Sequence, residues 1–254
     1  MDIEMNFSSF IKNYPLYFKT EPDYSKLEEH RRALDALTNL GYQNIFVIDF
    51  YKNNYWYLEI LPFFLYGHTK EEVIAMGIGF RSKVVMAEER ERQSKIYLNL
   101  LDFIMQLPVE RRKNVLFYTS HKCHHKSGHI FSIGLQVTPF LQDSNGNVWM
   151  ALGRISLASK THNSEAFIEM LDTKERFDYN ITKQTFLAST TTHLSEREQM
   201  ILALSAQGYT EQEISDSLYI SKNTVKFHKQ NVFEKFKVDN LSEAYCYSLV
   251  HKLW

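Results

Sequence analysis

The sequence has little cysteine and almost no surplus of charge. Only two of its 254 residues are cysteine, Cys123 and Cys246, and they stand far apart. Such a pair does not make the disulfide framework of a small secreted domain, and it fits a reducing cytoplasm. The formal net charge at pH 7 is −1. Any contact with a nucleic acid must therefore rest on a local group of basic residues rather than on overall charge.

Leader segments, long apolar runs and common catalytic motifs are also missing. The opening MDIEMNF has no basic segment followed by an apolar run, and the most apolar stretch, residues 60–66, is too short to cross a bilayer. The chain contains no glycine-rich phosphate loop, nucleophile elbow or paired-histidine metal helix. We therefore expect a cytoplasmic, non-enzymatic protein that does not enter a membrane. No pattern identifies a cofactor.

The last sixty residues contain regularly spaced helix-start signals. Ser or Thr followed three residues later by Glu forms a capping box, and Asn at the same spacing caps a helix in a similar way. These pairs are Ser195 with Glu198, Thr210 with Glu213, and Asn240 with Glu243, while Ser221 caps a further helix and Gly208 ends the first. The spacing predicts four short helices in a compact bundle.

The third of these helices, from Ser221 to about Phe236, has two different faces. Helical periodicity places a buried stripe on one side, comprising Val225, His228, Val232 and Phe236. The opposite face carries Asn223, Lys226, Phe227 and Gln230, and Lys222 and Lys229 flank the stripe. An outward face of amide, lysine and apolar groups suits base edges in a major groove, with the flanking lysines on phosphates. Spacing alone leaves open a plain solvated helix.

The run LSEREQMILALSAQGYTEQEISDSLYISKNTVKFHKQNVFEKFKV, continued by DNLSEAYCYSLVHKL, resembles the LuxR-type helix-turn-helix over residues 193–253. The resemblance implies a transcription regulator that binds double-stranded DNA with its third helix in the major groove. It gives Lys226, Phe227 and Gln230 the base-facing roles. The DNA-backbone contacts that it implies are Thr210, Ser221, Lys222, Asn223, Thr224 and Lys229.

The resemblance also implies a homodimer formed through the fourth helix, residues 242–254, where Tyr245, Leu249 and Trp254 can supply apolar contact. Two positions depart from the family pattern. Lys237 stands where the family usually has glycine, and Leu241 where it usually has arginine. The third helix is therefore expected to end differently from that of its relatives.

Residues 1–160 mix strands and helices and are expected to form a separate domain. A helix is predicted over 27–40 and strands over 44–50 and from 55, followed by a mostly helical stretch to about 107. Three strands are then predicted over 114–124, 129–140 and 147–158, joined by turns at Lys126-Ser127-Gly128 and Asp143-Ser144-Asn145-Gly146. Residues 161–192 are expected to be a linker with a possible hairpin formed by 167–171 and 177–181.

This order resembles a PAS domain. The resemblance rests on NIFVIDFYKNNYWYLEILPFFLYGHTKEEVIAMG at the opening and HKSGHIFSIGLQVTPFLQDSNGNVWMALGRISLA at the close. It implies a role in sensing or dimerisation, and a small-molecule ligand can lie between sheet and helices. The fold class expected for the whole chain is α+β: a PAS-like antiparallel sheet with helices, followed by an all-α helix-turn-helix domain at 193–254.

Two alternatives concern the N-terminal domain. His121, Cys123, His125 and His129 gather near one turn and are candidate ligands of a metal-binding or enzyme-like sensor, although their spacing matches no compact zinc motif. A degenerate phospho-acceptor receiver is the other alternative, with Asp49 after a strand-like run as its acceptor. No acidic pair precedes Asp49, and the strands cluster late instead of alternating with helices.

Overall fold

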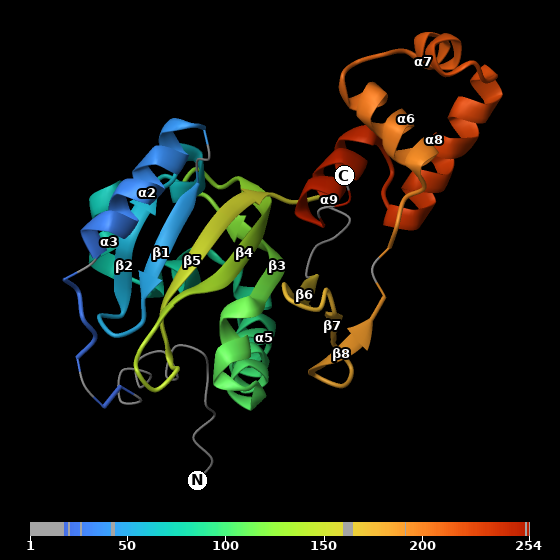
Figure 1. Ribbon diagram of the computed structural model, residues 1–254. Coiled ribbons are helices and arrows are strands. Elements are labelled where there is room, and N and C mark those ends of the chain that lie inside the picture. Colours follow the sequence, from blue (N-terminus) through green and yellow to red (C-terminus); the bar gives the residue numbers. More distant parts are fainter. Residues whose placement is uncertain are drawn as a thin grey trace. The chain divides into compact units, whose positions relative to one another are not determined.

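The computed structural model describes residues 18–19, 21–25, 27–41, 44–159, 165–190, 192–251 and 253. These residues group into two compact units. Unit 1 takes in the described residues up to Ser156 together with 165–189, and unit 2 those of 157–163 and 190–254. Both units are drawn in Figure 1.

Unit 1 is built on one sheet of eight strands in the order β2-β1-β5-β4-β3-β6-β7-β8 (Figure 1). The strands are β1 (Ile45–Asp49), β2 (Asn54–Glu59), β3 (Val115–His124), β4 (Ile130–Gln142), β5 (Val148–Leu157), β6 (Ala166–Met170), β7 (Arg176–Asn180) and β8 (Thr185–Ser189). Every pairing whose register is described is antiparallel. With the helical unit 2, this sheet confirms the α+β class.

The helices of unit 1 lie mainly between β2 and β3 in the chain. They are α2 (Leu27–Asn39), η2 (Pro62–Leu65), α3 (Lys70–Met76), α4 (Gly79–Val84), α5 (Ala87–Gln106) and η3 (Val109–Asn114). The predicted order of two strands, short helices, a long helix and three further strands is thus present. Thr69 and Glu72 form a capping box that fixes the start of α3.

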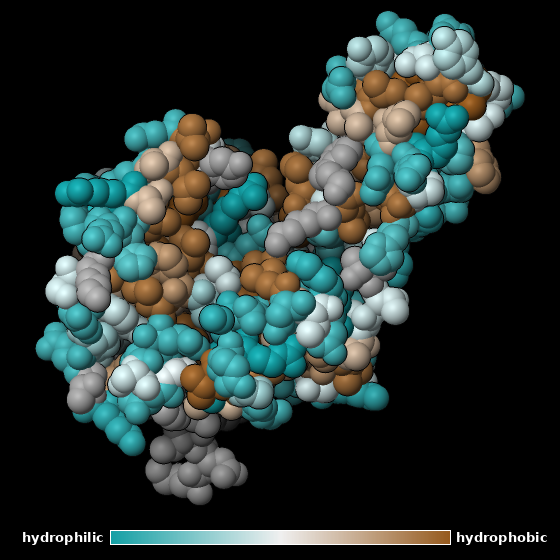
Figure 2. Space-filling view, viewed as in Figure 1, coloured by the Kyte–Doolittle hydropathy of each residue, from teal (hydrophilic) through white to brown (hydrophobic). Residues whose placement is uncertain are grey.

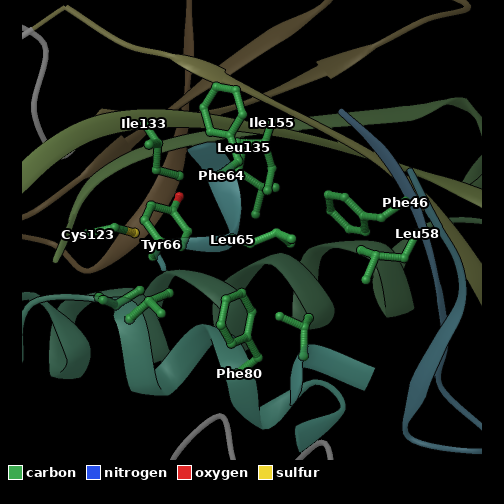
Figure 3. Packing of buried hydrophobic residues seen from close by; sticks show 13 residues of the cluster. Phe46, Leu58, Phe64, Leu65, Tyr66, Phe80, Cys123, Ile133, Leu135 and Ile155 are labelled. Atoms are coloured by element: carbon green, nitrogen blue, oxygen red, sulfur yellow. The ribbon is translucent and has the colours of Figure 1, made fainter. Parts of the chain in front are cut away.

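Both faces of β1 are covered, which explains why its sequence is an almost continuous apolar run. Phe46 belongs to a core cluster that includes Phe80 and Val84 of α4 (Figure 3). Its neighbours Ile45 and Val47 point to the opposite face and pack in a second cluster with Leu34 of α2.

Gly153 of β5 shows how tightly the sheet packs beside β1. A Cβ at this position would lie 2.1 Å from Cζ of Phe46. Phe46 is itself buried, at 2% exposure, so its ring has little room to move. Glycine is therefore required here for space, not for backbone conformation.

The stretch expected as a linker with a hairpin carries three strands. The pair β6 and β7 is the expected hairpin, with Phe167 opposite Asp178. The third strand, β8, was not predicted, since its half-exposed sequence TFLAS has no clear alternation. Because β6 pairs with β3, this segment enlarges the sheet.

The arrangement of unit 1 does not suit a receiver. A receiver fold alternates strands and helices around a parallel sheet, whereas here β3 to β8 follow one another without a helix between them. Asp49 is 2% exposed. Its carboxylate accepts hydrogen bonds from the Tyr24 hydroxyl at 2.7 Å and from the Tyr51 amide at 2.9 Å. Asp49 thus holds a turn and is not open to phosphorylation.

Unit 2 contains the four predicted helices, α6 (Glu196–Ala206), α7 (Glu211–Leu218), α8 (Lys222–Phe236) and α9 (Leu241–Val250). The expected capping boxes at Ser195 and Thr210 are both formed. Ser221 and Asn240 cap α8 and α9. Among the described residues, no helix is both long and apolar enough to span a membrane.

Candidate nucleic-acid interface

The helices α7 and α8 are joined by a three-residue turn, Tyr219–Ser221. Tyr219 ends α7 in the left-handed region, with φ 53°. The amide of Ile220 then donates to the carbonyl of Ser215 at 3.1 Å, and Ser221 begins α8. Two short capped helices joined by such a tight turn are the elements of a helix-turn-helix.

The buried side of α8 is largely the one that periodicity predicted. Val225 is 0% exposed and packs with Ile201 and Ile214. Val232 and Phe236 lie in a second small core with Leu202. His228, expected in the same stripe, is only half-buried. Helix α8 is therefore held along its length by α6 and α7, and its other side is left to solvent.

The outward side of α8 presents the expected residues. Lys222, Asn223, Lys226, Phe227 and Gln230 are exposed, and Thr224 and Lys229 are half-buried. Phe227 is 61% exposed. A large ring left in water on a well-capped helix has unused apolar surface available to a partner. Apolar side chains also reach the surface elsewhere in both units (Figure 2).

Glu211, at the start of α7, lies close to two of these lysines. Its carboxylate is 4.0 Å from Nζ of Lys226 and 3.6 Å from Nζ of Lys229. Sequence spacing could not reveal this, because the partners sit on different helices. Ion pairs at such exposure contribute little. A phosphate group can therefore replace Glu211 as the partner of Lys226 and Lys229, because little binding free energy is lost when these ion pairs break.

The hydroxyls of Thr210 and Ser221 are already engaged as helix caps. Oγ1 of Thr210 donates to Oε2 of Glu213 at 2.8 Å, and Oγ of Ser221 accepts from the amide of Thr224 at 3.1 Å. Each cap satisfies one amide, while the first turn of a helix presents further N–H groups. The start of α8 is thus suited to an anion such as a DNA phosphate.

The two departures from the family pattern occupy distinct places. Lys237 ends α8 in the left-handed region, with φ 54°, which is the conformation that glycine adopts without strain. Leu241 packs against the core of unit 2. On α9, Tyr245 and Leu249 are 40% and 43% exposed, whereas Trp254 lies outside the described residues.

The histidines and cysteine considered as metal ligands are not brought together. His121 and Cys123 are both 0% exposed, inside unit 1. His125 and His129 lie at the exposed turn, where each ring bonds to the Ser127 hydroxyl, at 2.7 and 2.9 Å. In the described part of the chain, no group of three such side chains is placed to hold a metal ion.

Residues 192–248 match the family model described as bacterial regulatory proteins, luxR family. The response regulator protein VraR of Staphylococcus aureus is 42% identical over 60 residues, which are 24% of this chain and 29% of that protein. VraR of Staphylococcus saprophyticus gives the same values. The chain thus matches only about 29% of the length of these curated relatives. The C-terminal unit contains a helix-turn-helix domain of the LuxR type.

Two solved structures are similar over more of the chain. The VqmA dimer of Vibrio cholerae without target DNA covers 87% of this chain and 88% of its own, at 18% identity and a TM-score of 0.33. The dark structure of the blue-light photoreceptor Aureochrome1 LOV covers 56% and 89%, at 19% identity and a TM-score of 0.35.

Proposed function

We propose that the chain is a transcription regulator that binds double-stranded DNA through α8. The observation that carries this proposal is the exposed face of α8, on which Lys226, Phe227 and Gln230 stand together on a rigidly packed helix of a LuxR-type domain. Lys226 and Gln230 read base edges by hydrogen bonds, and Phe227 meets an apolar group such as a thymine methyl.

The contacts to the DNA backbone surround this face. They come from Thr210, Ser221, Lys222, Asn223, Thr224 and Lys229, which lie at the first turns of α7 and α8 or beside the buried stripe. Hydroxyls, amides and lysines in these places position the helix over phosphates without reading sequence. In this proposal only Lys226, Phe227 and Gln230 distinguish one base sequence from another.

The protein acts as a homodimer in this proposal. Residues 193–254 contain seven lysines and arginines and eight aspartates and glutamates, a formal net charge of −1, so a single small domain has little electrostatic hold on DNA. Exposed Tyr245 and Leu249 on α9 offer apolar surface for a second copy, and pairing two domains reads two adjacent half-sites. Unit 1, whose element order resembles a PAS domain, supplies the sensing role.

The proposal is tested by measuring the affinity of the full chain for duplexes that the wild-type protein selects from a random library. Lys226→Glu removes a donor and adds repulsion, and we expect a loss of roughly 100-fold. Wild-type affinity should also fall steeply with salt, because each phosphate contact releases counterions.

Lys183→Glu is the matched control, because it makes the same change of charge on an exposed loop of unit 1. It should leave the affinity within about twofold of wild type, because Lys183 does not belong to the unit that is proposed to bind DNA. Equal affinities for Lys226→Glu and wild type would contradict the proposal.

A further inference from the structure

The positively charged guanidinium of Arg81, on α4, lies in the interior of unit 1. Its Nε and Nη1 atoms are buried, although the residue as a whole is only partly buried. The end of α4 is tied to β3, since Val85 bridges to Cys123 and the amide of Met86 donates to the carbonyl of Lys122 at 3.0 Å. The end of α4 is therefore fixed against β3, and two nitrogens of the Arg81 guanidinium are shielded from water.

No carboxylate balances this charge within the described residues, where Arg81 makes no ion pair. Nη2 donates to Nε2 of His121. The groups that act most strongly on Arg81 are the Cys123 thiol and the hydroxyls of Tyr97, Tyr66 and Tyr55. The nearby cation Arg92 differs, because its guanidinium lies 3.4 Å from the carboxylate of Glu89.

The side chains around Arg81 are neutral at pH 7. Burial raises the pKa of the Tyr55 hydroxyl to about 12 and raises the pKa of the Cys123 thiol. Burial, and then the charges of Arg81 and Arg92, lower the pKa of His121 well below its usual value. The arginine is always charged, so the cluster carries one uncompensated positive charge.

Several polar atoms of this cluster lack a hydrogen-bond partner in the part of the chain that is described. They are Nε and Nη1 of Arg81 and Nδ1 of His121. Tyr66 lies beside Cys123 in the packed interior (Figure 3) and is 0% exposed. Buried donors that find no acceptor are costly and uncommon in native proteins. The cluster is thus arranged for an acceptor that comes from elsewhere.

The surroundings favour a ligand with an apolar body. The nearby core contains Phe46, Phe64, Phe80 and Ile133, and Tyr55 and Tyr97 pack against it. Although both tyrosines lie within the unit, each keeps part of its surface accessible. An apolar group bound at the guanidinium would therefore contact the rings of Tyr55 and Tyr97.

We propose that Arg81 binds the carboxylate of a small monocarboxylic acid whose apolar part lies among Tyr55, Tyr66 and Tyr97. This proposal deepens the sensing role given to unit 1 and rests on it. A carboxylate accepts two hydrogen bonds from one guanidinium and supplies the missing negative charge. A phosphate dianion fits poorly, because it would bring two negative charges to one available cation.

The test is the thermal stability of the full chain in sodium acetate, propionate, butyrate and benzoate, each compared with sodium chloride at equal ionic strength. Acetate is the smallest probe of a carboxylate site, and the larger acids add the apolar body. We expect the melting temperature to rise with each carboxylate, in a concentration-dependent manner. Stabilisation should be greater for the larger acids, since they bury more apolar surface.

Arg81→Gln removes the charge and should weaken carboxylate binding about 10- to 100-fold. Without ligand, this variant should melt at or above the wild-type temperature, because an uncompensated buried charge is gone. Arg32→Gln, on the exposed face of α2, is the matched control and should bind as wild type does.

The proposal is overturned if no carboxylate stabilises the wild-type protein more than chloride, or if Arg81→Gln responds as strongly as wild type. A purely structural Arg81 would show a lower melting temperature in Arg81→Gln without ligand. DNA affinity is measured separately with Lys226→Glu, so loss of one proposal is distinguishable from loss of the other.

Discussion

At the scale of single residues, the carboxylate of Glu198 connects two helices of unit 2 by hydrogen bonds. It is 3% exposed. It accepts from the amide and hydroxyl of Ser195, at 2.8 and 3.0 Å, and from Nζ of Lys235 at 2.7 Å. Burial acts to raise the pKa of Glu198, but the hydrogen bonds from Lys235 and Ser195 outweigh it, and the net pKa lies below 4.5. Glu198 thus joins the start of α6 to the end of α8.

Glu198→Gln should lower the free energy of unfolding of unit 2 by about 1 kcal/mol at pH 7, because a charge-assisted bond becomes a neutral one and Lys235 is partly exposed. A carboxyl with a lowered folded pKa contributes stability above its unfolded pKa and loses it as pH falls through the folded pKa. The difference between variant and wild type should therefore vanish in acid.

Denaturant titrations followed by circular dichroism at several pH values measure this difference. Glu196→Gln is the control, since Glu196 is exposed in the same first turn, and it should change stability by less than about 0.5 kcal/mol. A Glu198→Gln deficit that is as large in acid as at neutral pH would contradict the assignment.

At the scale of elements, the end of α8 is determined by backbone conformation. Lys237 has φ 54°, and its amide donates to carbonyls of the last turn. A side chain with a Cβ pays about 1 kcal/mol or more in this region, whereas glycine does not. The lysine thus ends α8 in the conformation that a glycine would adopt without strain, so the replacement of glycine by Lys237 adds strain without moving the helix end away from this position.

Lys237→Gly should raise the free energy of unfolding of unit 2 by up to about 1 kcal/mol, since relief of strain exceeds the added flexibility of the unfolded chain. Lys237→Ala keeps a Cβ and should give no such gain. Thermal melts of both variants separate backbone strain from loss of the lysine charge, and equal melting temperatures for the two would show that φ is not the cause.

The predicted elements agree with the structure where their signals are local. The helices α6 to α9 each begin beside their capping residues. The turns at Gly128 and Gly146 join β3 to β4 and β4 to β5. The sequence did not predict β8, because this strand lies at the edge of the described sheet beside β7 and its side chains show no alternating pattern.

At the scale of the whole molecule, unit 2 has its own cores. One contains Val232, Phe236 and Leu253, and the other Ile201, Ile214 and Val225. All members of both clusters lie between residues 194 and 253. A domain that buries its apolar faces against itself can fold alone.

We therefore expect residues 190–254, produced alone, to be helical and to melt cooperatively. Phe236→Ala in this fragment should cost about 3–5 kcal/mol and unfold it, because Phe236 is 1% exposed in a small core. Circular dichroism against temperature measures both. A fragment without helical signal, or one indifferent to Phe236→Ala, would show that the cores depend on the rest of the chain.

The sequence by itself determined the LuxR-type helices, the buried stripe of α8 and most strands of unit 1, since caps, turns and periodicity act over a few neighbouring residues. Only the tertiary structure decided which distant residues meet. Glu211 reaches Lys226 and Lys229 across two helices, and Arg81 reaches His121 from helix to strand. It also separated the buried His121 and Cys123 from the exposed His125 and His129. Contacts of this kind depend on how helices and strands pack against one another, and the spacing of residues along the chain does not show that packing.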